Sequence, residues 1–417
     1  MTQAGIIVVG SGQGGFQVAA SLRDEGYAGP VTLIGEEPGL PYQRPPLSKA
    51  FLSGKSPAPQ IDLRPDHFYS EHAIRLLAGE RVTGIDRGAR QVTLASGASL
   101  AYDHLVLATG ARARLPAIAG VRLAGVLALR SRADAQALLE GLHQARRLVV
   151  VGAGFIGLEV AVAARDKGLD VHVLEFTDRV LKRSVSAPAA RYLAEALQAR
   201  GVRFSFGTGA AAFTAGEGAQ AGQLAAVVTT HGESVPADLA VVGIGVDPNM
   251  ELALDAGLAV QDGILVDASL LSSDPAISAI GDCARYPAFF ADAPVRLESV
   301  QNAVDHARCV AARLVGKAQH YARVPWFWSD QGSNRLQIAG VAHADDECVL
   351  RGDAAPPDSP AKFSVFRFRA GHLTAVESIN NAGDHMAARK LLTHPACITP
   401  AQAADPRISL ASLVPAA

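Results

Sequence analysis

The chain has 417 residues, of which 49% are hydrophobic and 19% are charged, and its formal net charge at pH 7 is −2. That length exceeds what one hydrophobic core usually supports, so we expect two or three domains. The near balance of charge gives no reason to expect nucleic acid or an anionic membrane as a partner. No basic and then apolar leader precedes the first predicted strand, which favours a cytoplasmic protein without a signal peptide.

The first predicted unit is a strand, a glycine-rich turn and a helix. The apolar run Ile6–Val9 reads as a buried strand, and Gly10, Gly12 and Gly15 follow it in G-x-G-x-x-G spacing. The helix predicted over 16–25 would aim free N–H groups and a partial positive charge at a pyrophosphate. Glu36 ends the next strand, 21 residues after Gly15, where an acid is expected on the ribose hydroxyls.

The segment that follows is rich in proline, PGLPYQRPPLSK over residues 38–49. Its prolines forbid a long helix, so we expect a stiff extended segment laid across the surface of the first domain. Arg44 and Lys49 are its cations, and both are candidates for cofactor contact. Residues 81–100 alternate like a β-meander, and a buried strand then closes on Ala108, Thr109 and Gly110, small residues suited to close approach of a ligand.

The opening pattern then repeats. A strand over 146–151 leads into Gly152, Gly154 and Gly157, and Glu175 ends the following strand 18 residues after Gly157. Two complete fingerprints predict an α/β fold with two Rossmann-like domains that hold two dinucleotides. A carboxylate at position 175 repels a 2′-phosphate, which favours NAD over NADP.

The rest of the chain carries no further fingerprint. Strands are predicted over 238–245 and 274–282, and a helix over 300–314. From about residue 323 the pattern is that of a separate α+β module, with strands at 336–340 and 363–369 and a basic helix at 386–392. The four cysteines (Cys283, Cys309, Cys348 and Cys397) and the twelve histidines lack metal-ligand spacing, so we predict free thiols and no metal site.

These stretches together resemble the glutathione-reductase-like flavoproteins, and in particular the ferredoxin reductases of the putidaredoxin reductase family, which serve bacterial cytochrome P450s and ring-hydroxylating dioxygenases. The segments that carry the resemblance are GSGQGG, PYQRPPLSK, LATG, VGAGFIGLE, VVGIGVDPN, AIGDCAR, LESVQNA and PWFWSDQ, and the resemblance covers essentially the whole chain. The resemblance implies NADH-dependent reduction of FAD and single-electron transfer to a [2Fe–2S] ferredoxin. It also implies an interrupted FAD domain (1–112 and 246–322), an NAD domain (113–245) and a C-terminal α+β domain (323–417).

The resemblance further implies roles for individual residues. Lys49 and Glu159 correspond to a pair beside the flavin ring and are the expected catalytic residues. The expected FAD contacts are Gly10, Gly12, Gly14, Gly15, Glu36, Arg44, Lys49, Val82, Ala108, Thr109, Gly110, Arg130, Gly281, Asp282, Val300 and Trp328. The expected NAD contacts are Gly152, Gly154, Phe155, Ile156, Gly157, Glu159, Glu175, Arg183, Gly243, Ile244 and Gly245.

Ferredoxins of this class are expected to be acidic, so we predict a basic docking patch of Arg308, Arg313 and Lys317 with Trp328 as its apolar centre. Three other functions share parts of the pattern. Disulfide reductases need a cysteine pair, and NADH oxidases and peroxidases a single cysteine, in a region where residues 41–49 hold none. A flavoprotein like apoptosis-inducing factor, whose association state responds to NADH, is the remaining alternative.

Overall fold

The computed structural model describes residues 4–54, 58–218, 221–317, 320–354, 361–394 and 397–415. The chain divides into two compact units, each assembled from three stretches of sequence. Unit 1 contains Met1–Arg44, Ala58–Arg112 and Val246–Arg323, and unit 2 contains Pro45–Pro57, Ala113–Gly245 and Val324–Ala417. The division into three domains stays a prediction.

Unit 1 is built on a seven-stranded sheet with the order β3-β2-β1-β6-β5-β4, in which β18 also pairs with β6. The pairs among β3, β2, β1, β6 and β18 are parallel, whereas β5 runs antiparallel to the first part of β6. The strands are β1 (Gly5–Val9), β2 (Val31–Gly35), β3 (Ile74–Ala78), β4 (Val82–Asp86), β5 (Gln91–Leu94), β6 (Ser99–Leu107), β16 (Val246–Pro248), β17 (Ile264–Leu265), β18 (Ile277–Ala279) and β19 (Ala284–Arg285). The helices are α1 (Gln13–Asp24), α2 (Asp66–Glu71), α6 (Glu251–Asp255) and α7 (Val300–Leu314).

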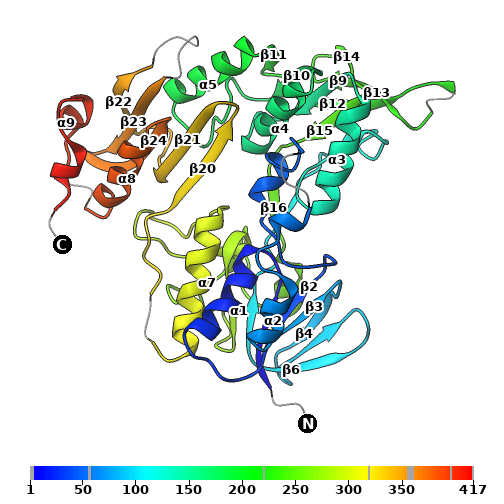
Figure 1. Ribbon diagram of the computed structural model, residues 1–417, viewed down its shortest axis with the longest axis vertical. Coiled ribbons are helices and arrows are strands. Elements are labelled where there is room, and N and C mark those ends of the chain that lie inside the picture. Colours follow the sequence, from blue (N-terminus) through cyan, green and yellow to red (C-terminus); the bar gives the residue numbers. More distant parts are fainter. Residues whose placement is uncertain are drawn as a thin grey trace. The chain divides into compact units, whose positions relative to one another are not determined.

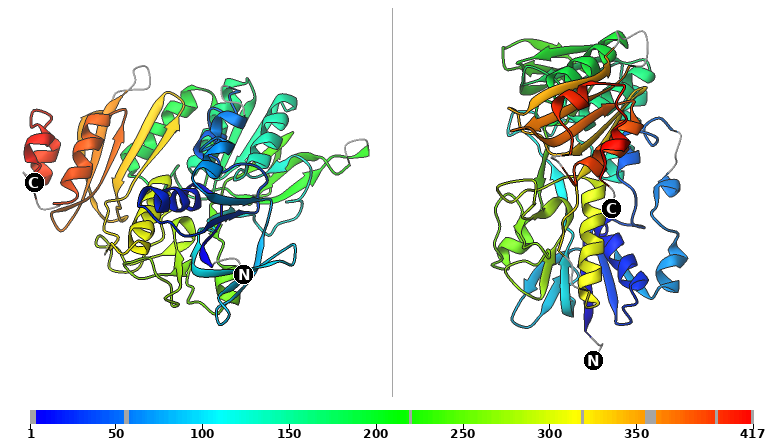
Figure 2. Two further views of the ribbon diagram at one scale, coloured as in Figure 1. Left: turned by 60° about the horizontal axis from the view of Figure 1, so that its bottom comes forward. Right: turned by 90° about the vertical axis from the view of Figure 1, so that its left-hand side faces the viewer.

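Helices α1 and α7 pack against each other, as both panels of Figure 2 show in blue and yellow. Small residues let the two backbones approach closely, since a Cβ on Gly14 of α1 would lie 3.5 Å from the Cβ of Ala303 on α7. Helix α7 has the bounds that were predicted. Helix α1 begins three residues earlier than predicted because the fingerprint glycines Gly14 and Gly15 form its first turn rather than precede it.

Unit 2 contains a five-stranded parallel sheet with the order β11-β10-β9-β15-β8 and a three-stranded antiparallel sheet, β12-β13-β14. The first two segments of this unit hold β7 (Ala111–Ala113), which straddles the unit boundary, β8 (Val126–Leu127), α3 (Arg132–Gln144), β9 (Arg147–Val151), α4 (Phe155–Asp166), β10 (Asp170–Glu175), α5 (Ala187–Ala199), β11 (Val202–Phe206), β12 (Ala210–Ala215), β13 (Leu224–Thr229), β14 (Ser234–Pro236) and β15 (Leu239–Val242). The parallel strands of the two sheets confirm the predicted α/β fold with two Rossmann-like halves.

The C-terminal segment of unit 2 is a five-stranded antiparallel sheet, β20-β21-β24-β23-β22, with two helices beside it (Figure 1). Its elements are β20 (Trp326–Gln331), β21 (Asn334–Gly340), β22 (Glu347–Asp353), β23 (Lys362–Arg369), β24 (His372–Ile379), α8 (Ala382–Leu391) and α9 (Pro400–Ala404). The predicted strands and basic helix of this region all fall on these elements. Among the described residues no helix is long and apolar enough to cross a membrane.

The prediction that the proline-rich segment is extended across the surface of the first domain is wrong. Residues Pro45–Ser48 form a 3-10 helix in unit 2, where Leu47 is 2% exposed and Leu52 is fully buried. Leu52 belongs to the same core cluster as β9 and α4. The prolines do exclude a long helix, but burial of these two leucines decides where the segment packs.

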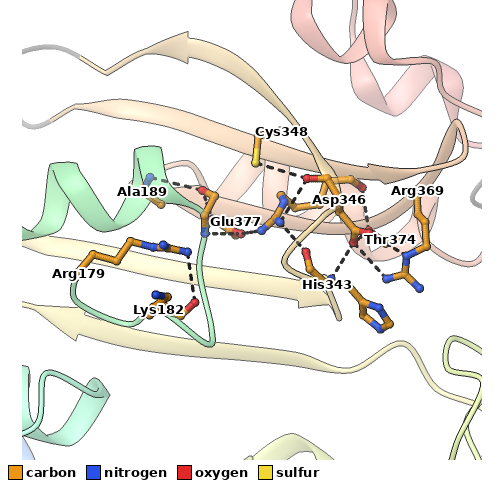
Figure 3. A network of polar contacts seen from close by, with 11 residues as sticks. Arg179, Lys182, Ala189, His343, Asp346, Cys348, Arg369, Thr374 and Glu377 are labelled. Atoms are coloured by element: carbon orange, nitrogen blue, oxygen red, sulfur yellow. Dashed lines mark hydrogen bonds and ion pairs between the residues drawn. The ribbon is translucent and has the colours of Figure 1, made fainter. Parts of the chain in front are cut away.

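A buried polar network joins the C-terminal sheet to the start of α5 within unit 2 (Figure 3). Glu377 on β24 accepts the backbone N–H of Ser186 at 2.8 Å and its hydroxyl at 2.6 Å. The same carboxylate forms an ion pair with Arg367 at 3.0 Å, and both side chains are almost fully buried. Ser186 also caps α5, so one carboxylate fixes the helix N-terminus to the sheet.

Candidate functional site

The first glycine cradle lies in unit 1, between β1 and α1. Gly10 has a φ of +109°, and a Cβ there would lie 2.1 Å from the Ala108 carbonyl oxygen. A Cβ on Gly15 would lie 1.8 Å from the Gly10 carbonyl oxygen, so helix and strand meet too closely for any larger residue. Gly14 packs less tightly against Ile280 and Ala303. The backbone contacts explain why glycine is needed at positions 10 and 15, whereas position 14 is only tightly packed.

Gly12 differs because the space beside it is open. No described atom lies within 4 Å of the place its Cβ would take, and Gly12 is the N-cap of α1 with no side-chain cap. The first N–H groups of the helix therefore receive no side-chain cap from Gly12, and the space beside this residue is open. A pyrophosphate of FAD fits this cradle, since helix N-termini of this kind bind anions through backbone N–H groups.

The second cradle, in unit 2 between β9 and α4, repeats this geometry. Gly152 has a φ of +101°, with its Cβ position 2.5 Å from the Gly243 carbonyl oxygen, and the Cβ position of Gly157 lies 2.3 Å from the Gly152 carbonyl oxygen. Gly154 caps α4 without a side-chain hydrogen bond, and the nearest described atom to its Cβ position is 3.7 Å away. The pyrophosphate of a second dinucleotide fits here for the same reason.

The two acids that follow the cradles differ in their surroundings. Glu36, after β2, is exposed and forms a long contact of 3.5 Å with Arg81. Glu175, at the end of β10, accepts the Ala153 N–H at 2.7 Å and both the N–H and hydroxyl of Thr177. The second acid is therefore held against its own glycine turn, where an adenosine ribose would lie.

The end of β6 is tied to the segment after β16. The Thr109 hydroxyl donates to the Asn249 carbonyl at 2.6 Å, and the Asn249 amide donates to the Thr109 carbonyl at 2.9 Å. The Asn249 N–H also donates to Gly110, whose φ is +65°. Asn249 thus fixes Thr109 and Gly110. It was not predicted as a site residue, although it lies in VVGIGVDPN, one of the segments that carried the resemblance.

Gly281 and Asp282 lie in a short 3-10 turn after β18, beside α7. The Gly281 N–H donates to Nδ1 of His306 at 3.2 Å, and His306 is fully buried between the rings of Tyr286 and Tyr321. Burial lowers the pKa of His306 to about 3, so its ring stays neutral and can accept this hydrogen bond. Sequence analysis had assigned no role to His306, because no pattern relates it to Gly281.

A buried carboxylate cluster surrounds Glu159 on α4. Lys49 Nζ lies 2.7 Å from Oε2 of Glu159, which also accepts the Ser48 hydroxyl. Oε1 accepts the Ser329 hydroxyl at 2.5 Å, and the Gln331 amide donates to Ser329 at 2.7 Å. Glu159 is 4% exposed, so these donors offset the cost of burying its charge.

The predicted Lys49–Glu159 pair is therefore present, within unit 2. Ser48, Ser329 and Gln331 were not predicted as members of the cluster. Ser48 lies in PYQRPPLSK, while Ser329 and Gln331 lie in PWFWSDQ, so two of the segments that carried the resemblance held the signal.

The remaining candidates are distributed over both units. In unit 1, Arg44 pairs with Glu37 at 2.7 Å, Val82 begins β4 and Val300 begins α7. In unit 2, Arg130 precedes the capping box of α3, and Trp328 on β20 is half-buried. Near the second cradle, Phe155 packs on Phe327, and Ile156 is 42% exposed. The residues that follow β15 are Gly243, Ile244 and Gly245. The Arg183 guanidinium lies 3.8 Å from the place that a Cβ on Gly245 would take. Their ligand contacts stay predictions.

The predicted basic docking patch is wrong for Arg313, whereas Arg308 and Lys317, whose side chain is 64% exposed, stay predictions. Arg313 is half-buried and donates to the Ser278 hydroxyl at 2.6 Å, and burial lowers its pKa. Lys317 forms an ion pair with Glu25 at the end of α1. Of the three, Arg308 alone is exposed without such a contact among the described residues. Five residues separate 308 from 313, so the two side chains lie on different faces of α7.

None of the four cysteines forms a disulfide in the described structure. Cys283, directly after Asp282, is fully buried, and burial raises the pKa of its thiol. Burial also raises the pKa of Cys309, Cys348 and Cys397. Thiols with raised pKa values are poor nucleophiles at neutral pH.

Comparison with known proteins gives a consistent result over the whole chain. The family model described as pyridine nucleotide-disulphide oxidoreductase matches residues 4–307, and the one described as reductase C-terminal matches residues 326–414. Rhodocoxin reductase of Rhodococcus erythropolis is 49% identical over 400 residues, covering 96% of this chain and 92% of that protein. Putidaredoxin reductase of Pseudomonas putida is 38% identical over 415 residues, covering 99% and 97%.

Two solved structures extend the comparison to the fold. The ferredoxin reductase for the CYP199A2 system of Rhodopseudomonas palustris superposes with a TM-score of 0.95 at 44% identity, covering 99% of this chain and 100% of that one. Putidaredoxin reductase in its covalent complex with putidaredoxin superposes with a TM-score of 0.94 at 37% identity, covering 99% of each chain.

Proposed function

Because the chain belongs to the pyridine nucleotide-disulphide oxidoreductase family, we propose that it is an FAD-containing, NADH-dependent ferredoxin reductase. The observation that carries the proposal is the pair of matching glycine cradles, one in each unit, each with an uncapped helix N-terminus beside open space. The unit 1 cradle would hold FAD and the unit 2 cradle NADH. Bound FAD supplies chemistry that side chains lack, because it accepts a hydride and releases electrons singly.

The partner is a [2Fe–2S] ferredoxin that serves a cytochrome P450 or a ring-hydroxylating dioxygenase. This proposal rests on relatives that include rhodocoxin reductase, putidaredoxin reductase and the ferredoxin reductase component of a chlorobenzene dioxygenase of Cupriavidus. We also propose a cytoplasmic location, which four free cysteines support.

The residues of this chain would bind and orient the two dinucleotides. Backbone N–H groups at the starts of α1 and α4 would bind the pyrophosphates, and Asp282 would accept from a hydroxyl of the FAD. Lys49 and Glu159 would lie beside the reacting rings, where the fixed cation favours added negative charge. Ser48, Ser329 and Gln331 hold Glu159 in one orientation, which suits a reaction that depends on alignment.

The two cradles can be tested separately by Gly12→Ala and Gly154→Ala. Both glycines have φ values near −70°, and a methyl group meets no described atom within 3.7 Å at either position, so both variants should fold. We expect Gly12→Ala to lower FAD affinity by about tenfold or more, because the methyl group occupies the space of the pyrophosphate. FAD retention on dialysis measures this effect.

Gly154→Ala should retain FAD and instead raise the KM for NADH by a similar factor. The two variants act as controls for each other, since each changes one cradle and leaves the other intact. Loss of FAD from both, or from neither, would contradict the assignment of FAD to unit 1 and NADH to unit 2.

The preference for NADH is tested at Glu175. We expect kcat/KM for NADH to exceed that for NADPH by on the order of 100-fold, because a carboxylate repels the 2′-phosphate. Glu175→Ala should lower the ratio of the two kcat/KM values, mainly by raising kcat/KM for NADPH. Glu233 is an exposed acid of the same unit, and Glu233→Ala should leave the ratio unchanged. Equal kcat/KM values in the unaltered protein would refute the preference.

A further inference from the structure

Glu175 and Phe176 lie next to each other at the end of β10, but their side chains have different surroundings. Glu175 is turned toward the glycine loop, where it accepts the Ala153 N–H. The next residue, Phe176, is 74% exposed, the highest exposure of any large hydrophobic side chain among the described residues. Single exposed apolar side chains are common on protein surfaces, but this ring directly follows the acid that is held against the second glycine turn.

The backbone that carries Phe176 is held on both sides. The Glu175 carbonyl accepts the Thr208 N–H at 3.0 Å, and the Thr177 carbonyl accepts the Gly207 N–H at 2.9 Å. The Thr177 N–H and hydroxyl both donate to Glu175. Phe176 therefore sits on a fixed continuation of the β10–β11 ladder.

One side of the ring lies beside Gly209. Its Cδ2 atom lies 3.4 Å from the Cβ position of Gly209, a position whose other near neighbour is the Thr230 methyl group. A larger residue at 209 would press on the ring, whereas glycine leaves room for it. The greater part of the ring remains open to a ligand.

We infer that Phe176 is the stacking platform for the adenine of NADH. This inference rests on the proposed function, which assigns the unit 2 cradle to NADH. The two halves of an adenosine differ chemically, and two adjacent residues match them. The Glu175 carboxylate suits the ribose hydroxyls, and the Phe176 ring suits the flat apolar base. Stacking between a base and an aromatic side chain is strong enough to dominate the affinity of such a fragment.

The test separates the adenosine half of the dinucleotide from the nicotinamide half. FAD-loaded protein is titrated calorimetrically with ADP-ribose, and reduced nicotinamide mononucleotide is used to bleach the flavin. Phe176→Ala should raise the Kd for ADP-ribose about tenfold and leave the bleaching rate with the mononucleotide unchanged. Phe176→Trp should restore ADP-ribose binding. Phe289→Ala, which removes a ring that is 61% exposed in unit 1, should change neither quantity.

The outcomes distinguish the inference from the function on which it rests. Equal ADP-ribose affinity in the unaltered protein and in Phe176→Ala would overturn the role of Phe176 alone. Loss of ADP-ribose binding together with slower bleaching by the mononucleotide would also overturn it, because the substitution would then act on the whole unit. Failure of the unaltered protein to bind ADP-ribose would overturn the proposed use of NADH.

Discussion

Single side chains at the candidate sites act mainly by fixing backbone turns and other side chains. His306 accepts the N–H of Gly281 and so holds the turn that carries Asp282, while its own ring is enclosed by two tyrosines. Ser48 and Ser329 do the same for Glu159. Sites of this kind need supporting contacts because small displacements of reacting groups are costly.

Burial of His306 makes stability depend on pH. Its pKa is about 6.5 when unfolded and about 3 in the folded protein. Between these values the unfolded chain binds a proton that the folded protein does not, so the free energy of unfolding falls as pH falls through this window. The loss is about 1.4 kcal/mol per pH unit.

His306→Gln removes this titration and keeps an acceptor for the Gly281 N–H. We expect acid unfolding, followed by circular dichroism, to begin at a lower pH in this variant. His372→Gln, at an exposed histidine, should follow the unaltered profile. An unchanged acid midpoint in His306→Gln would show that other groups dominate the transition.

At the scale of elements, one buried ion pair lies where the C-terminal sheet meets the start of helix α5. Glu377→Ala leaves the Arg367 guanidinium buried without its carboxylate and removes the acceptors of Ser186. We expect unit 2 to lose about 3–5 kcal/mol of stability. Both tryptophans lie on β20 of this unit, so urea unfolding followed by tryptophan fluorescence reports the loss.

Two further variants serve as controls for Glu377→Ala. Glu377→Gln keeps one acceptor oxygen for Ser186 and should lose less stability than Glu377→Ala. Arg407→Ala removes an exposed ion pair with Asp405 in the same C-terminal segment and should change stability by less than about 0.5 kcal/mol. An equal effect at positions 377 and 407 would contradict the structural role of the buried pair.

For the molecule as a whole, the fold places two dinucleotide cradles in one chain without a redox disulfide among its described cysteines. We therefore expect anaerobic dithionite titration of the FAD-loaded protein to end after two electrons per FAD, since no cysteine pair stores two more. Blocking the thiols with N-ethylmaleimide should not alter this count. Uptake of four electrons would favour a disulfide reductase.

Much of the fold could be predicted from the sequence because the signals are local. Each fingerprint combines a β-branched strand, glycines at fixed offsets and a helix within about 30 residues. Each glycine cradle can therefore be predicted from its local sequence alone. The same holds for the β-meander that leads into β6 and for the bounds of α7. The error in the start of α1 was also local, since two glycines were assigned to the turn rather than to the helix.

The tertiary structure alone decided which distant residues meet. Glu159 receives donors from positions 48, 49 and 329, and His306 meets Gly281 across the gap between a turn and a helix. Arg313 was predicted to be a surface cation, yet the packing of α7 brings its guanidinium to the Ser278 hydroxyl. Likewise, the prolines restrict the backbone near Pro45, but the segment packs in unit 2 because Leu47 and Leu52 are buried there. Such contacts depend on how whole elements pack, which no short stretch of sequence specifies.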